Sequence, residues 1–119
     1  MVSVIPRIVL SNDVKSFIRR NRHPKVPFWA ALIGTHKKGN YLVNSVVPVV
    51  YNTVCPHNKR PLKGVSNVLG IIHSHPNGQT LPSTDDLERA PRNMIHIILG
   101  SGEPGYWFKK DHYLLEVKI

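Results

Sequence analysis

Residues 70–86 have the sequence Gly-Ile-Ile-His-Ser-His-Pro-Asn-Gly-Gln-Thr-Leu-Pro-Ser-Thr-Asp-Asp, and the rest of the chain is organised around them. The segment from Leu69 to Ser74 is apolar and includes β-branched isoleucines, which predicts a buried strand. Side chains two residues apart on a strand point to the same face. His73 and His75 are therefore expected to present two imidazoles side by side at the end of this strand.

A helix is predicted to begin near the end of the same stretch. Ser83 is a residue type that favours an N-cap, and Asp86 would then lie in the first helical turn. Two interpretations of this pair stay open: a capping box, or a carboxylate directed at the two histidines. Two imidazoles and one carboxylate form a three-ligand set with an open fourth position, which is typical of a catalytic rather than a structural zinc site.

The complete string resembles the signature of the JAMM (MPN-plus) metalloproteases. It has His73-x-His75, then the residues from Pro76 to Pro82, then Ser83-x-x-Asp86. The flanking strands extend the resemblance to a compact archaeal or prokaryotic JAMM domain. The resemblance implies a Zn²⁺ ion bound by His73, His75 and Asp86, with Ser83 as a catalytic residue near the oxyanion. It also implies hydrolysis of peptide or isopeptide bonds, with a ubiquitin-like protein or its conjugates as the partner.

One position departs from the family pattern. JAMM enzymes use a glutamate as general base, seven residues before a glycine, and counting back from Gly34 gives Pro27. The glutamates of this chain, Glu88, Glu103 and Glu116, lie elsewhere in the sequence. The general base is therefore unassigned, and the departure predicts a slow enzyme, a base supplied by a partner chain, or a domain that binds without cutting.

Three functions stay open at this point. The first is a JAMM-type zinc isopeptidase or protease with a substituted base. The second is a catalytically silent zinc-binding JAMM domain that serves in recognition or assembly. The third is a nucleic-acid-associated domain, because RadC-type proteins share the His-x-His-Pro and Ser-x-x-Asp string. A domain of this size is also expected to use a protein partner or a homodimer.

Composition narrows the class of protein. A chain of 119 residues with 41% hydrophobic residues predicts one globular domain over 1–119. No apolar run approaches the roughly 20 residues of a membrane helix. Cys55 is the single cysteine, which excludes an intramolecular disulfide and favours an intracellular, cytoplasmic setting.

The chain is strongly basic, with 16 Lys and Arg against 7 Asp and Glu and a formal net charge of +9. Such a charge favours an acidic partner, either a nucleic acid or an acidic protein face. However, the basic residues are dispersed, and the sequence has neither an RNP-like aromatic pattern nor helix-turn-helix spacing. Nucleic acid is therefore the less expected partner.

The remaining periodicity predicts a mixed α/β (α+β) fold in the order β-α-β-β-β-α-β-β-β. In a JAMM/MPN fold this order gives a cytidine-deaminase-like sheet flanked by two or three helices. His96 is expected either in the core or behind the metal ligands, but not as a ligand itself. Leu87 and Ala90 are expected on the inward side of the second helix. The expected segments are strands at Val2–Ile5, Phe28–Ile33, Tyr41–Val50, Leu69–Ser74, Met94–Leu99, Tyr106–Phe108 and Tyr113–Ile119, a Ser11-capped helix with Val14, Phe17 and Ile18 inward, a second helix from Thr84, and a loop at 52–67.

Overall fold

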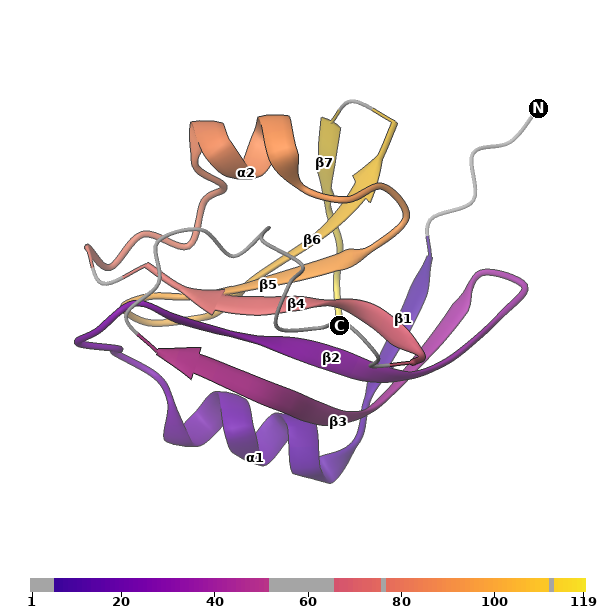
Figure 1. Cartoon of the computed structure of the whole chain (residues 1–119), viewed down its shortest axis with the longest axis horizontal. Helices are drawn as coiled ribbons and strands as arrows, with labels where there is room; N and C mark the ends of the chain where they lie inside the picture. Colours follow the sequence, from indigo (N-terminus) through magenta and orange to yellow (C-terminus); the bar gives the residue numbers. More distant parts are fainter. Residues whose placement is uncertain (1–5, 52–65, 76, 112) are drawn as a thin grey trace.

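The computed structural model describes residues 6–51, 66–75, 77–111 and 113–119. This part of the chain forms one sheet of seven strands and two helices (Figure 1). The mixed α+β class and the element order are as predicted. The elements are β1 (Arg7–Leu10), α1 (Asn12–Arg20), β2 (Phe28–Lys37), β3 (Asn40–Tyr51), β4 (Val68–Ser74), α2 (Thr84–Arg89), β5 (Ile95–Leu99), β6 (Gly105–Lys110) and β7 (Tyr113–Glu116).

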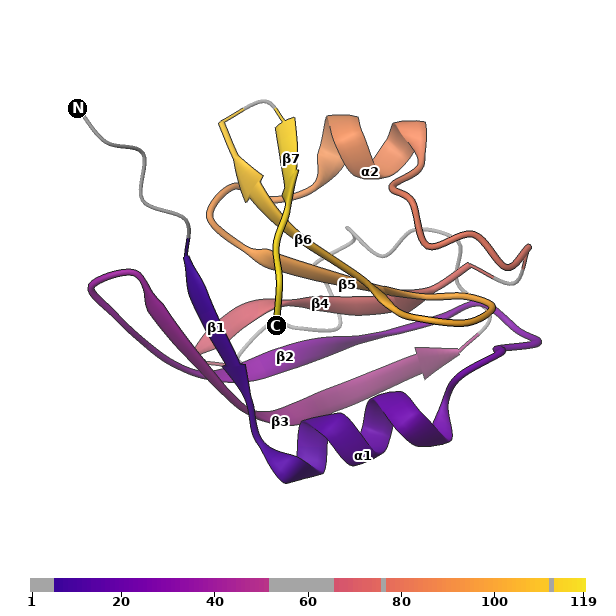
Figure 2. The same cartoon turned by 180° about the vertical axis from the view of Figure 1, so that it is seen from behind.

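The strands lie in the order β1-β3-β2-β4-β5-β6-β7. The pairs β1–β3 and β4–β5 are parallel, and the other neighbouring pairs are antiparallel. Parallel neighbours need a crossover connection, and the one between β4 and β5 contains α2. The two helices lie on opposite sides of the sheet, as both views show (Figures 1 and 2). The β4–β5 crossover, which contains α2, starts at the carboxyl end of β4, where His73 and His75 lie.

Helix α1 forms as its sequence predicts. The Ser11 side chain accepts a hydrogen bond from the Val14 N–H at 3.3 Å and caps the amino end. Val14 and Ile18 are buried, and Phe17 packs against the core beside them. A nine-residue helix has little stability alone. Packing of this apolar stripe against the sheet therefore stabilises α1.

Both faces of the central sheet are buried. On one face, the core includes Phe28, Ala30 and Leu32 of β2 together with side chains from α1 and the neighbouring strands. Strand alternation turns Trp29 and Ala31 to the other face, and these residues are 1% and 0% exposed. The second face is the one that carries His73, because Trp29 and His73 are directly paired in the β2–β4 ladder.

Several segment predictions need correction. The predicted strand at Val2–Ile5 lies outside the described residues, and the first described strand is β1. Strand β2 continues past Ile33 to Lys37, because its polar end pairs with β3 in solvent. Strand β7 ends at Glu116, and Ile119 is 45% exposed rather than part of a half-buried strand. Most of the predicted 52–67 loop, including Cys55, also lies outside the described residues.

The buried side of α2 differs from the prediction. Ala90 is buried as expected, but Leu87 is 45% exposed, so its inward placement was wrong. Asp86, four residues before Ala90, takes the inward position and is 2% exposed. The short helix thus turns a carboxylate, and not its leucine, toward the sheet.

Neither helix in the described part of the chain has the length and apolar character required to cross a bilayer.

Candidate metal centre

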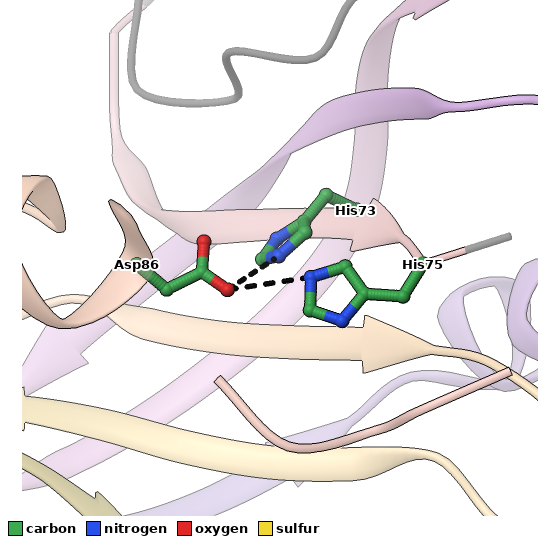
Figure 3. Close-up of side chains that lie close together, drawn as sticks. All are labelled: His73, His75 and Asp86. Atoms are coloured by element: carbon green, nitrogen blue, oxygen red, sulfur yellow. Dashed lines mark hydrogen bonds and ion pairs between the residues drawn. The ribbon is translucent and has the colours of Figure 1, made fainter. Parts of the chain in front are cut away.

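His73, His75 and Asp86 come together in one cluster (Figure 3). His73 lies in β4, His75 directly follows this strand, and Asp86 is in the first turn of α2. One carboxylate oxygen, Asp86 Oδ2, is 3.3 Å from Nε2 of His73 and 3.3 Å from Nε2 of His75. The centroids of the two imidazole rings are 5.0 Å apart, so the end of β4 places the rings side by side, as predicted.

The spacing of these three groups fits a zinc ion. Bonds of about 2.1 Å to a tetrahedral zinc separate neighbouring ligand atoms by about 3.4 Å, close to the two observed separations. All three ligand atoms lie within 4.8 Å of one another. His73 and Asp86 are almost completely buried and His75 is partly exposed, so the cluster is open on one side. Burial of an ionised carboxylate such as that of Asp86 costs free energy unless a positive charge lies close to it. A bound cation would supply this charge.

The capping box predicted at Ser83 is present. The Ser83 Oγ accepts the N–H of Asp86 at 3.1 Å, and Asp86 Oδ2 accepts the N–H of Ser83 at 2.9 Å. The two interpretations of this pair are therefore compatible, because the same oxygen that closes the capping box also faces both histidines. Helix capping thus orients the carboxylate. Ser83 is exposed, and its hydroxyl keeps a proton that it can donate.

Ser74, between the two histidines, joins β4 to the segment that precedes β2. Its Oγ donates to the Val26 carbonyl at 3.0 Å and accepts the Phe28 N–H at 2.8 Å. The sequence pattern indicated no role for this serine. These bonds fix the end of β4 and hold Val26 to Phe28 directly beside the cluster.

Lys109 donates a hydrogen bond to the carboxyl end of α2, and the sequence did not predict this contact. The Leu87 carbonyl would normally accept the N–H of residue 91, but Pro91 has none. Lys109 of β6 is 4% exposed, and its Nζ donates to the Leu87 carbonyl. The lysine therefore replaces the missing donor and places a positive charge at the carboxyl end of the helix. A proline four residues after a helical leucine was the only local signal of an unsatisfied carbonyl.

We expect Lys109→Met to loosen α2 and thereby to weaken metal binding. Loss of the hydrogen bond should lower the free energy of unfolding by on the order of 1 kcal/mol. It should also lower zinc affinity about tenfold, as for groups that orient metal ligands. Urea denaturation and zinc titration measure the two effects. Lys118→Met, at an exposed lysine beyond β7, is the control, and equal zinc affinity in both variants would contradict the role of Lys109.

The family position of the general base holds Pro27, which directly precedes β2. Its neighbours Val26 and Phe28 are hydrogen-bonded to Ser74 at the end of β4. Among the described residues, the cluster that could hold a metal contains no glutamate. The three glutamates of the chain lie elsewhere. Glu103 Oε1 is 3.5 Å from a guanidinium nitrogen of Arg22. Glu116 is paired with Trp107 in the β6–β7 ladder, and Glu88 is exposed on α2.

His96 lies in the core, as predicted. It is 1% exposed in β5 and is paired with Ile71 in the β4–β5 ladder. It does not belong to the metal-ligating cluster of the described residues.

The chain belongs to the family described as prokaryotic homologues of the JAB domain, which matches residues 19–111. This match includes both histidines, Ser83 and Asp86. No curated protein matches the chain.

Two solved structures have a similar fold. One is the solution structure of a protein from Desulfitobacterium hafniense, with 18% identity, a TM-score of 0.66, and coverage of 93% of this chain and 90% of the other. The second is a JAB1/MPN domain protein from Archaeoglobus fulgidus, with 19% identity, a TM-score of 0.54, and coverage of 94% and 96%. The predicted JAMM/MPN fold is thereby confirmed.

Proposed function

We propose that this domain is a JAMM-type zinc hydrolase that cleaves peptide or isopeptide bonds to ubiquitin-like proteins. The observation that supports this proposal best is the His73–His75–Asp86 cluster, with its two 3.3 Å separations and its open side. His73, His75 and Asp86 would hold the ion. Zinc in a three-ligand site supplies Lewis-acid chemistry, which acidifies water and polarises a carbonyl.

The residues of the chain have distinct tasks in this proposal. The capping box orients Asp86, and Ser74 fixes the strand end between the histidines. The Ser83 hydroxyl would donate to the oxyanion that develops on the scissile carbonyl. A well-placed donor of this kind contributes on the order of 3 kcal/mol to the transition state.

A second candidate function is a zinc-binding domain that recognises a partner without cutting it. Pro27 favours this alternative, because proline has no group that can take a proton from water. A general base typically contributes about 10²–10⁴ in rate. Without one, the domain would be slow, or it would use a base from a partner chain.

The first test is the zinc content of the purified protein and of His75→Ala, measured by elemental analysis. We expect about one zinc per chain in the wild type, as for a three-ligand site, and none in the variant. His36→Ala is the matched control, because His36 is exposed and stacks on Tyr41, outside the metal-ligating cluster. Absence of zinc from the wild type, even after incubation with the metal, would contradict both candidate functions.

Cleavage separates the two candidates. A hydrolase should cut a fusion to a ubiquitin-like protein, and the activity should disappear in His75→Ala. A recognition domain should bind zinc in the same ratio and show no turnover with any metal.

A further inference from the structure

A second feature lies in the connection between α1 and β2. The residues 20–26, together with Phe28, line an open hollow of about 180 Å³. Its lining includes three cationic side chains and one imidazole, and all four are exposed: Arg20, Arg22, Lys25 and His23. We call this feature the basic hollow.

The connection that carries the basic hollow is held in place by hydrogen bonds at several points. The Asn21 side chain donates to the Phe17 carbonyl at 2.8 Å and closes the end of α1. His23 has a left-handed backbone conformation with φ 57°, and its N–H donates to the Gly100 carbonyl at 3.2 Å. The charged side chains therefore project from a fixed backbone, which lowers the entropy cost of binding a ligand.

The basic hollow and the metal cluster share one edge of the sheet. Val26 and Phe28 line the hollow, and both are hydrogen-bonded to Ser74, which lies between the two histidines. The His75 N–H in turn donates to the Leu99 carbonyl at 2.8 Å, next to the Gly100 that holds His23. Ser74 alternates with His73 on β4, so the hollow and the cluster lie on opposite faces of the sheet at this shared edge, and a polypeptide that contacts both must pass over the edge.

The charges of the basic hollow are mostly uncompensated. Arg22 lies 3.5 Å from Glu103 and also donates to the Gly102 carbonyl. In the part of the chain that the structure describes, which contains every Asp and Glu, neither Arg20 nor Lys25 has an acidic partner. Arginine binds a carboxylate through two parallel hydrogen bonds, so these side chains suit an acidic residue.

We propose that the basic hollow binds an acidic side chain of the polypeptide that the metal site receives, and so selects substrates with an acidic residue near the scissile bond. This proposal rests on the proposed function. The hollow of about 180 Å³ is large enough to admit a carboxylate side chain. A single-stranded nucleic acid held by base stacking would need an exposed aromatic side chain, and Phe28 in the lining is only 4% exposed.

The test is a binding measurement with chelator present, which makes it independent of zinc and of cleavage. The probe is a fluorescein-labelled peptide with two glutamates, compared with the same peptide carrying glutamines, and fluorescence anisotropy gives the affinities. The charge-reversed variant is Arg20→Glu with Lys25→Glu. The control, Lys37→Glu with Lys38→Glu, has the same net charge but changes exposed residues of the β2–β3 hairpin.

We expect the glutamate peptide to bind about tenfold more tightly than the glutamine peptide, and reversal of Arg20 and Lys25 to remove this preference. The preference should survive in the hairpin control and in His75→Ala. An equal loss in the hairpin control would show a mere net-charge effect and overturn the proposal, as would equal binding of the two peptides by the wild type. Tighter binding of a single-stranded oligonucleotide, lost on reversal of Arg20 and Lys25, would also overturn it. A positive result without any cleavage would leave this site intact while the hydrolase proposal fails.

Discussion

Replacing Asp86 with alanine is expected to abolish zinc binding, because its Oδ2 is the atom that faces both histidines. Zinc at about 100 times its dissociation constant should raise the free energy of unfolding of the wild type by about 2.7 kcal/mol and leave the variant unchanged. With chelator present, the variant also lacks the acceptor for the Ser83 N–H, and the loss of this one hydrogen bond costs about 1 kcal/mol. Urea denaturation with zinc and with chelator measures both effects.

Asp86→Asn separates the two tasks of this residue. Its amide oxygen can still accept the Ser83 N–H, but it has no charge and is a poor zinc ligand. We therefore expect a capped helix without zinc. The control is Asp85→Asn, which removes only a partly exposed ion pair with Arg89 at 3.1 Å. Stoichiometric zinc in Asp86→Ala would exclude this carboxylate from the site.

The parts of the centre that local geometry determines were predictable from the sequence. The spacing of His73 and His75 on a strand requires both imidazoles on one side, and the rings are indeed 5.0 Å apart. The cap at Ser83 is equally local. That α2 would bring Asp86 over the end of β4 follows from no local spacing, and only the family resemblance indicated it.

The wrong placement of Leu87 and the unpredicted contacts of Lys109 and Ser74 share a physical cause. The apolar pattern predicted Leu87 on the inner side of α2, but at this position the requirements of the cluster override hydrophobic burial. The contact between Lys109 and Leu87 joins residues 22 positions apart, and its origin is the donor missing at Pro91. Ser74 of β4 reaches Val26, 48 positions away in the sequence and just before the neighbouring strand β2. Contacts of this range depend on the strand order, which periodicity does not determine.

The largest gain in activity is expected from Pro27→Glu. Residue 27 directly precedes β2, and continued strand alternation would direct a side chain there to the face of Trp29 and His73. The bonds of Ser74 hold its neighbours at the end of β4. A glutamate there could take a proton from water and pass it to the leaving amine. Such a base is worth about 10²–10⁴ in rate. The zinc-loaded variant should therefore cleave a ubiquitin-like fusion faster than the wild type by a factor in this range.

Pro27→Gln is the matched control, because it has the same side-chain length and backbone change but cannot act as a base at neutral pH. Both variants lose the rigidity of proline, at a cost of roughly 0.4–1 kcal/mol in stability. Any gain that is specific to glutamate must then come from proton transfer, and it should fall at acidic pH as the carboxylate becomes protonated. If the two variants were equally active, residue 27 would not face the reacting water, and a base from a partner chain would become the better explanation.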